Sequence, residues 1–307
     1  MPASTDTRGE KWADRIRRLA ADRKAVILAH NYQPPEIQEI ADLCGDSLEL
    51  SIKAARTDAE VIVFCGVQFM AETASILSPD KTVLLPRREA GCPMADMVTP
   101  EALSVRLDEL GPIPVVTYVN SSAAVKAMST VCCTSANVIK VVDSIDADEI
   151  LMVPDRNLAA YAASKTRKTI HTWNGYCPFH NALTPADVEM ARLRHPNAVF
   201  MAHPECPMSV LELADVIAST SGMIDYAGKS NDCEFIVGTE VGLIHPLQKA
   251  NPGKLFYPAS EKMLCPDMKR ISLEDVTASL ENLTGEIKVP EEIRVRAIAA
   301  VERMLGV

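Results

Sequence analysis

The sequence lacks long apolar runs, an export signal and an excess of positive charge. No apolar stretch among its 307 residues approaches the roughly 20 that a membrane-spanning helix needs. No signal-peptide pattern precedes Trp12, so we expect a cytoplasmic protein without membrane contact. The net charge of −10 argues against nucleic acid or an anionic membrane as a partner.

Low-complexity segments are also absent, and only residues 1–11 resemble a disordered lead-in. Nine cysteines, an odd number without an export signal, indicate a reducing compartment and free or metal-bound thiols. With 48% hydrophobic residues, the chain can bury the cores of several domains. Composition therefore agrees with a soluble enzyme and excludes little else.

Three Cys-Pro pairs recur at almost even intervals along the chain. They are Cys92-Pro93, Cys177-Pro178 and Cys265-Pro266. Seven residues after each cysteine comes a helix-start signal, a Ser or Thr with an acidic residue shortly after it. These signals begin at Thr99, Thr184 and Ser272. Self-similarity at a fixed period predicts one unit repeated three times.

The repeat extends to the polar residues that follow three apolar runs, at 25–29, 113–117 and 198–202. The first residue after each run is His30, Tyr118 or His203. Two positions further on lie Tyr32, Asn120 and Glu205. Seventeen positions after the first set lie Ser47, Ser135 and Thr220. So many matches in step indicate a true internal repeat.

Strand-like and helix-like patterns alternate within each unit, which predicts parallel sheets covered on both faces. The stretches 36–43, 123–131 and 209–218 are amphipathic and predict helices. We expect an α/β fold: a pseudo-threefold triplication of a three-layer αβα sandwich with the active site at the central junction. The expected units are 12–92, 93–177 and 178–266, with C-terminal helices in 267–307 packing back on the first.

Three thiolates, one from each unit, suit a metal centre shared at the pseudo-threefold axis. Structural zinc usually takes four ligands in close pairs, and these three cysteines form no such pair. A 4Fe–4S cube held by three thiolates would leave one iron open, and a Pro directly after a ligand Cys recurs in iron–sulfur sites. Spacing alone leaves zinc and purely structural thiols open.

The remaining cysteines have a simpler interpretation as small buried hydrophobes. They are Cys44, Cys65, Cys132, Cys133 and Cys233. Cys206-Pro207 shows that the dipeptide alone proves nothing, because it lies near a helix start rather than at the end of a unit. The repeat position is what distinguishes the other three.

Ligands of open parallel sheets bind beyond the carboxyl ends of the strands, where the polar pairs of all three units fall. A single His or Tyr there is commonly a structural donor, but three pairs in register favour a binding site. Ser47, Ser135 and Thr220 are expected to cap the second helices, and capping alone would explain each. The same geometry presents hydroxyls and amides to a carboxylate or phosphate.

Several ordered motifs, spanning about 25–271, resemble the quinolinate synthase family. Among them are His30-Asn31-Tyr32-Gln33, Gly91-Cys92-Pro93-Met94-Ala95, Cys132-Cys133-Thr134-Ser135-Ala136-Asn137, His203-Pro204-Glu205-Cys206 and Met263-Leu264-Cys265-Pro266. The resemblance implies a transferase of NAD biosynthesis that condenses iminoaspartate with dihydroxyacetone phosphate to quinolinate, releasing phosphate and water. It also implies a 4Fe–4S cluster whose open iron acts as a Lewis acid, and an imine supplied by L-aspartate oxidase or aspartate dehydrogenase.

Carried over motif by motif, the resemblance makes Cys92, Cys177 and Cys265 the cluster ligands. The implied substrate-binding residues are His30, Ser47, Tyr118, Asn120, Ser135, His203, Glu205 and Thr220. From side-chain chemistry we expect Glu205, with Tyr32, His203 and Tyr118, to carry acid–base catalysis. Some relatives carry a CxxCxxC run at the last ligand; Ala259 and Lys262 stand there in this chain, so disulfide control is excluded.

Two other functional classes stay open. A hydro-lyase of the aconitase type would also use three cysteines and an open iron, but it would act on a hydroxy-acid and need no phosphate pocket. A non-enzymatic iron–sulfur sensor would need the cluster but not three converging polar pairs.

Overall fold

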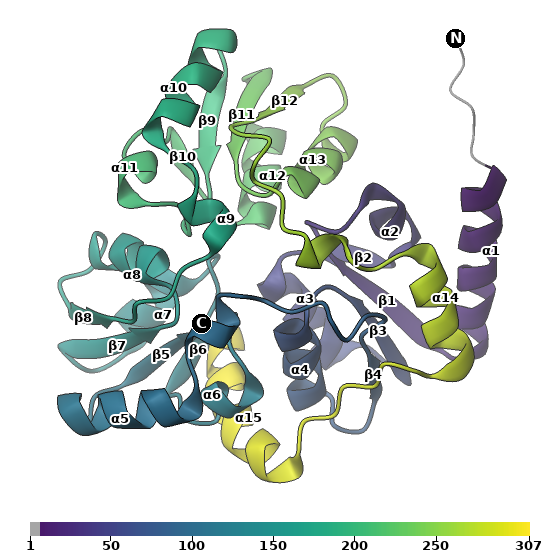
Figure 1. Ribbon diagram of the computed structural model, residues 1–307, viewed down its shortest axis with the longest axis horizontal. Helices are drawn as coiled ribbons and strands as arrows, with labels where there is room; N and C mark the ends of the chain where they lie inside the picture. Colours follow the sequence, from purple (N-terminus) through teal and green to yellow (C-terminus); the bar gives the residue numbers. More distant parts are fainter. Residues whose placement is uncertain (1–6) are drawn as a thin grey trace.

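The computed structural model describes residues 7–307, with side chains from Trp12 onward. It contains three four-stranded parallel sheets, each flanked by helices, arranged as three lobes around a common centre (Figure 1). Positions 1–6 of the predicted lead-in lie outside the described residues, and helix α1 (Thr7–Asp22) begins directly after them. The α/β class and the triplicated layout predicted from the sequence are confirmed.

All three sheets have the same strand order, in which the first long strand lies between the second and third strands of its lobe. The orders are β2-β1-β3-β4, β6-β5-β7-β8 and β10-β9-β11-β12. The first sheet comprises β1 (Ala25–His30), β2 (Leu43–Gly45), β3 (Val61–Cys65) and β4 (Thr82–Leu84). The second comprises β5 (Val115–Tyr118), β6 (Val131–Cys133), β7 (Glu149–Val153) and β8 (Thr169–Thr172). The third comprises β9 (Val199–Ala202), β10 (Val216–Ile217), β11 (Glu234–Gly238) and β12 (Leu255–Pro258).

Helices connect successive strands and cover the sheets, because parallel pairing requires a crossover between neighbours. In the first lobe they are α2 (Pro35–Ile40), α3 (Ser47–Arg56) and α4 (Gln68–Leu77). In the second they are α5 (Pro100–Leu110), α6 (Ala123–Lys126), α7 (Val138–Ser144) and α8 (Arg156–Ala163). In the third they are α9 (Pro178–Asn181), α10 (Pro185–Arg194), α11 (Met208–Leu211), α12 (Thr220–Lys229) and α13 (Ile244–Ala250). Short 3₁₀ turns occur at Ala95–Met97, Val241–Leu243 and Asp267–Lys269.

The edge strands β2, β6 and β10 were not expected. The sequence predicted helices over 36–43, 123–131 and 209–218, whereas α2, α6 and α11 are shorter and an edge strand follows each of them. These strands have only two or three residues, too few for a period-2 pattern to appear. They bring the chain back to the carboxyl end of the sheet, where α3, α7 and α12 begin.

The three repeated helix-start signals are confirmed. The Thr99 side chain accepts a hydrogen bond from the amide of Ala102. Thr184 and Ser272 each form a capping box with the acidic residue three positions later. Each cap satisfies a free amide at its helix start, so this part of the unit follows from local sequence.

Of the C-terminal helices α14 (Leu273–Asn282) and α15 (Glu291–Leu305), the first packs on the first lobe and the second reaches beyond it. Helix α14 packs against α1 and β3, whereas α15 contacts α4 of the first lobe and α6 and β6 of the second. The side chain of Asn137 donates a hydrogen bond to the carbonyl of Met304, 3.0 Å away. Helix α15 therefore joins two lobes instead of covering one. Among residues 7–307, no helix is both long and apolar enough to cross a membrane.

The segment between these helices is attached to the edge of the first sheet. Leu84 forms an antiparallel bridge with Glu286, and the amide of Leu85 donates to the carbonyl of Gly285 at 2.9 Å. Gly285 has a φ of 83°, and a Cβ built on it would lie 2.3 Å from the carbonyl oxygen of Leu85. The close approach requires glycine here.

Replacing Gly285 with alanine should therefore destabilise the protein more than the matched change Gly111→Ala. Gly111 also has a positive φ, but a Cβ added to it would meet no atom within 4 Å. Gly111→Ala should cost only its own backbone strain, about 1–3 kcal/mol, because a φ of 80° with a ψ of −168° is a conformation that essentially only glycine adopts. Thermal unfolding of the two variants tests this, and equal losses would contradict a steric role for Gly285.

Candidate functional site

One pocket is lined by side chains from all three lobes. The empty space among its lining atoms is about 700 Å³, part of it open to solvent. It contains every residue that the sequence singled out. These are His30, Tyr32, Ser47, Cys92, Tyr118, Asn120, Ser135, Cys177, His203, Glu205, Thr220 and Cys265. The structure therefore brings the whole candidate set together, and the roles of its members stay predictions.

Strand ends explain this convergence. Strand β1 ends at His30, β5 ends at Tyr118, and β9 ends one residue before His203. The three sheets share one topology, so these equivalent positions lie at equivalent carboxyl-terminal edges. The pocket is where the three edges meet.

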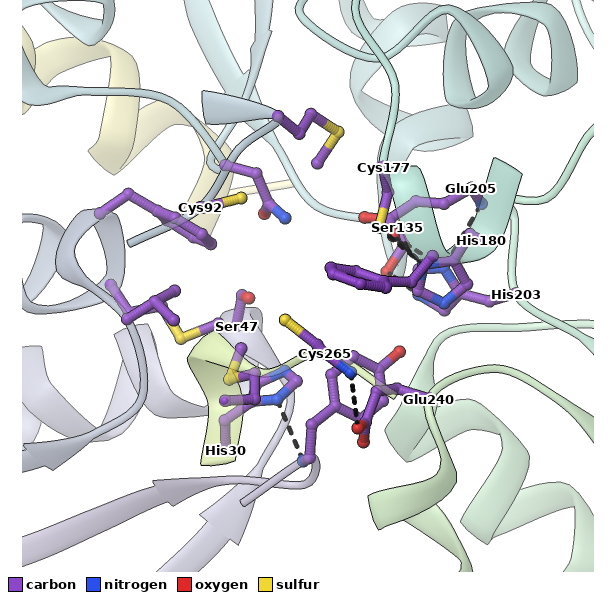
Figure 2. A pocket seen from close by; sticks show the side chains of 18 of the residues that line it. His30, Ser47, Cys92, Ser135, Cys177, His180, His203, Glu205, Glu240 and Cys265 are labelled. Carbon is purple, nitrogen blue, oxygen red and sulfur yellow. Dashed lines mark hydrogen bonds and ion pairs between the residues drawn. The ribbon is translucent and has the colours of Figure 1, made fainter. Parts of the chain in front are cut away.

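Cys92, Cys177 and Cys265 enter the pocket from three sides (Figure 2). All three are half-buried free thiols. Burial raises the pKa of the Cys92 thiol to about 12 and that of Cys265 to about 11. Three soft sulfur donors that line one cavity fit a three-cysteine iron–sulfur cluster in donor type.

The other cysteines largely match the prediction that they are small hydrophobes. Cys65, Cys132 and Cys133 are fully buried, and so is Cys206. Cys44 is half-buried. The prediction is wrong for Cys233, which is exposed because it precedes β11 at the surface of the third lobe.

A buried carboxylate, Glu205, is the centre of the hydrogen-bond network. The Tyr118 hydroxyl donates to its Oε1 at 2.7 Å, and His180 Nδ1 lies 2.7 Å from its Oε2. Burial raises the pKa of Glu205, but His180, followed by His203 and Tyr118, stabilises the anion and brings the pKa to about 2. Glu205 is therefore ionised and accepts hydrogen bonds from two lobes.

Tyr32 reaches Glu205 through two further side chains. Its hydroxyl hydrogen-bonds to Thr239 Oγ1, which lies 2.8 Å from His180 Nε2. Since Glu205 can only accept, the consistent arrangement has each donor in the series Tyr32, Thr239 and His180 directed toward the carboxylate. Burial raises the pKa of both Tyr32 and Tyr118 well above the ordinary phenol value, so both are protonated donors.

His30 and His203 have the same local geometry. The Nδ1 of each accepts the backbone amide two residues on, from Tyr32 at 3.2 Å and from Glu205 at 3.3 Å. Burial lowers the pKa of both rings to about 3, so both are neutral at pH 7. Each therefore keeps an Nε2–H donor, which in His203 lies 3.2 Å from Ser135 Oγ.

The expectation that Ser47, Ser135 and Thr220 cap helices is wrong. The N-caps of α3, α7 and α12 are Asp46, Asn137 and Ser219. Ser47 and Thr220 are the first residues of their helices, one position inside the cap. Because other residues make the caps, the three hydroxyls face the pocket instead, and Thr220 accepts the side-chain amide of Asn31 at 2.9 Å.

A family model described as "Quinolinate synthetase A protein" matches residues 14–306. This chain belongs to the quinolinate synthase family. It is 56% identical over 293 residues to "Quinolinate synthase" of Geotalea uraniireducens, covering 95% of this chain and 96% of the relative. It is 58% identical over 294 residues to "Quinolinate synthase 1" of Methanosarcina acetivorans, with the same coverage. The protein is thus an enzyme of NAD biosynthesis, and the resemblance stated from the motifs is confirmed.

Sequence reasoning missed three buried residues of this quinolinate synthase site, namely His180, Thr239 and Glu240. Thr239 and Glu240 directly follow β11, as Asp155 follows β7. The rule that selected the ends of β1, β5 and β9 would have found them if applied to the next strand of each sheet. His180 follows Cys177 by three residues, where the other units have Ala95 and Met268, so the repeat gave no signal.

Glu240 holds the loop that carries the last cysteine. Its Oε1 accepts the backbone amide of Cys265 at 3.1 Å, and its Oε2 accepts from Lys269 at 2.9 Å. Lys269 also donates to the carbonyl of Tyr32. The third cysteine is therefore fixed relative to the first lobe through one buried ion pair.

Gly175 fixes the second cysteine in a comparable way. A Cβ built on it would lie 2.4 Å from the carbonyl oxygen of Pro154, and backbone atoms cannot yield as a flexible side chain can. Gly91 stands one residue before Cys92, and the nearest atom to a Cβ built there is 4.0 Å away.

Gly175→Ala should therefore displace Cys177, lower the unfolding midpoint and reduce the iron bound after anaerobic reconstitution. Gly91→Ala should leave both quantities close to those of the unmodified protein. Iron analysis and thermal unfolding of the two variants provide the comparison. A Gly91 variant as defective as the Gly175 variant would show that the clash with Pro154 is not the reason.

Proposed function

We propose that the protein condenses iminoaspartate with dihydroxyacetone phosphate to quinolinate, releasing phosphate and water, in the pocket between its three lobes. The observation that supports this most directly is that one thiol from each lobe faces the cavity that holds the Glu205 network. We also propose that the lobes correspond to units 12–92, 93–177 and 178–266.

Cys92, Cys177 and Cys265 would hold a 4Fe–4S cluster, leaving one iron without a protein ligand. When bound, the cluster supplies a Lewis acid that polarises a hydroxyl or carboxylate oxygen of the reacting molecule. The protein side chains supply binding, orientation and proton transfer.

Neutral donors would hold the anionic substrates. Among the described residues, the pocket lining includes neither Lys nor Arg. It offers instead the Nε2–H groups of His30 and His203 and the hydroxyls of Ser47, Ser135 and Thr220. Helix α12 starts at the pocket with neutral Ser219 as its cap, so its positive end favours a carboxylate or phosphate.

Asn120 adds a polar group poised for a ligand. Within the described part of the chain, its buried side-chain oxygen Oδ1 has no hydrogen-bond partner. A buried acceptor without a partner costs free energy, which a donor on the substrate would recover. A hydroxyl or imine N–H of the substrate is such a donor.

Glu205 and Tyr118 would carry out the proton transfers at carbon. Glu205 is ionised and can accept a proton, while Tyr118 is protonated and can donate one. Tyr32 would be linked to the same carboxylate through Thr239 and His180. His203 would orient the substrate through its Nε2–H and keep Glu205 in place, since its Nδ1 accepts the backbone amide of Glu205 at 3.3 Å.

An aconitase-type hydro-lyase is the alternative within the same chemistry. It would need no phosphate site, whereas the neutral donors and the start of α12 could hold one. A non-enzymatic sensor disagrees with membership in an enzyme family. We further propose a cytoplasmic location and an imine supply from L-aspartate oxidase or aspartate dehydrogenase.

The reaction can be tested directly by incubating the iron-loaded protein anaerobically with fresh iminoaspartate and dihydroxyacetone phosphate. Quinolinate should appear by mass and ultraviolet absorbance. Cys92→Ser, Cys177→Ser and Cys265→Ser should each lose iron and activity, because each removes one of three ligands. Cys233→Ser, which changes an exposed thiol, should retain both. Dehydration of a hydroxy-acid added in a parallel incubation, with no quinolinate formed in the first, would favour the hydro-lyase instead.

Glu205→Gln should lower kcat by about 10²–10⁴-fold, because the amide keeps the shape of the side chain but cannot accept the proton. Ser47→Ala should chiefly raise KM, since the hydroxyl is expected to bind substrate and not to transfer protons. Steady-state kinetics of both variants at matched iron content separates the two effects. An unaltered kcat in Glu205→Gln would remove this residue from acid–base catalysis.

A further inference from the structure

A second set of metal-binding atoms shares the pocket with the three cysteines. It comprises Cys177 Sγ, a ring nitrogen of His180 and a carboxylate oxygen of Glu205, all within 4.8 Å of one another. His180 and Glu205 are only 2% and 4% exposed, and Cys177 is half-buried. Two of the three belong to no role proposed for the iron–sulfur cluster.

These atoms lie close together, as the ligands of one metal ion do, and a proton occupies the place where the cation would bind. His180 Nδ1 lies 3.1 Å from Cys177 Sγ and 2.7 Å from Glu205 Oε2, yet one Nδ1–H cannot donate fully to both. Ligands of a tetrahedral ion at about 2.0–2.3 Å stand about 3.3–3.8 Å from one another. Small side-chain rotations would reach those separations without movement of the backbone.

Charge and donor type select a zinc-like ion. A thiolate and a carboxylate neutralise a divalent cation, which would stabilise the buried Glu205 charge in place of the His180 Nδ1–H donor. Thiolate, imidazole and carboxylate are all zinc ligands, and three protein ligands leave the fourth position for a water or a ligand from the pocket. A carboxylate and an imidazole make the set less suited to an iron–sulfur cluster than three thiolates.

The surroundings of His180 suit metal binding as well. When Nδ1 binds an ion, the ring proton stands on Nε2, which is 2.8 Å from Thr239 Oγ1. A ligand histidine usually donates its second N–H to such an oxygen, which fixes the ring orientation. The proton of the Cys177 thiol leaves to solvent as the ion enters, so the exchange balances.

We propose that the iron-free protein binds one zinc-like divalent cation through Cys177, His180 and Glu205. Because Cys177 belongs to both ligand sets, this ion and the iron–sulfur cluster exclude one another. Zinc bound here therefore delays cluster assembly. The competition rests on the proposed function, but the metal site does not.

The test uses the full chain stripped of iron under anaerobic conditions and titrated with Co²⁺, whose absorption reports thiolate ligation and tetrahedral geometry. One Co²⁺ should bind per chain. His180→Ala, His180→Gln and Glu205→Gln should weaken binding at least about tenfold, as loss of even supporting residues does. Cys92→Ser and Cys265→Ser are the matched controls and should bind as tightly as the unmodified chain.

Three outcomes would overturn the site: no Co²⁺ binding, binding unchanged in both His180 variants, or equal loss in Cys92→Ser. The last would place the ion among the three cysteines. Circular dichroism of each variant separates loss of a ligand from loss of the fold.

The competition has its own measurement. Zn²⁺ added before iron and sulfide should slow reconstitution of the unmodified protein, and His180→Gln should remove the delay. An equal delay in both would refute the competition. Quinolinate formation by protein loaded without zinc does not depend on zinc binding, so the two proposals fail separately.

Discussion

The buried carboxylate of Glu205 is the constraint on which the site depends. Burying an ionised carboxylate in the protein interior costs free energy unless hydrogen-bond donors surround it. Here the donors come from different parts of the chain: Tyr118 from the end of β5, and His180 from α9. The second and third lobes must therefore be in register for the charge to be tolerated. The positions of Tyr32 and Thr239 follow from the same requirement, because they complete the hydrogen bonds of His180.

The three lobes have the same backbone arrangement but carry different side chains at equivalent positions. Each lobe has a strand end, a helix start and a cysteine at corresponding places. The cysteines keep the same chemistry in all three copies, and so do the hydroxyls of Ser47, Ser135 and Thr220. At or directly after the ends of β1, β5 and β9 stand two neutral histidines and a phenol. In the second and third lobes a buried acidic residue, Asp155 or Glu240, stands two residues after the end of β7 or β11. A symmetric scaffold thus produces an asymmetric pocket, as the two dissimilar substrates of the proposed reaction would require.

The sequence predicted the parts of this protein that repeat. Strand ends such as His30 and Tyr118, and helix caps such as Thr184, are local signals, and equivalent positions in one topology meet in space. His180 was not predictable in this way because its counterparts are Ala95 and Met268. The cap assignments failed by one residue at Ser47 and Thr220, where Asp46 and Ser219 are the caps, and by two at Ser135, where Asn137 is the N-cap. Edge strands of two or three residues gave no periodic signal at all.

Two hydrogen bonds that join different lobes involve residues that line the pocket. Tyr118 to Glu205 joins the second lobe to the third, while Asn31 to Thr220 joins the first to the third. A movement that separates the third lobe from the other two would break both hydrogen bonds. Under the proposed function, the proton donor Tyr118 and the acceptor Glu205 are therefore in place only while the second and third lobes are in contact.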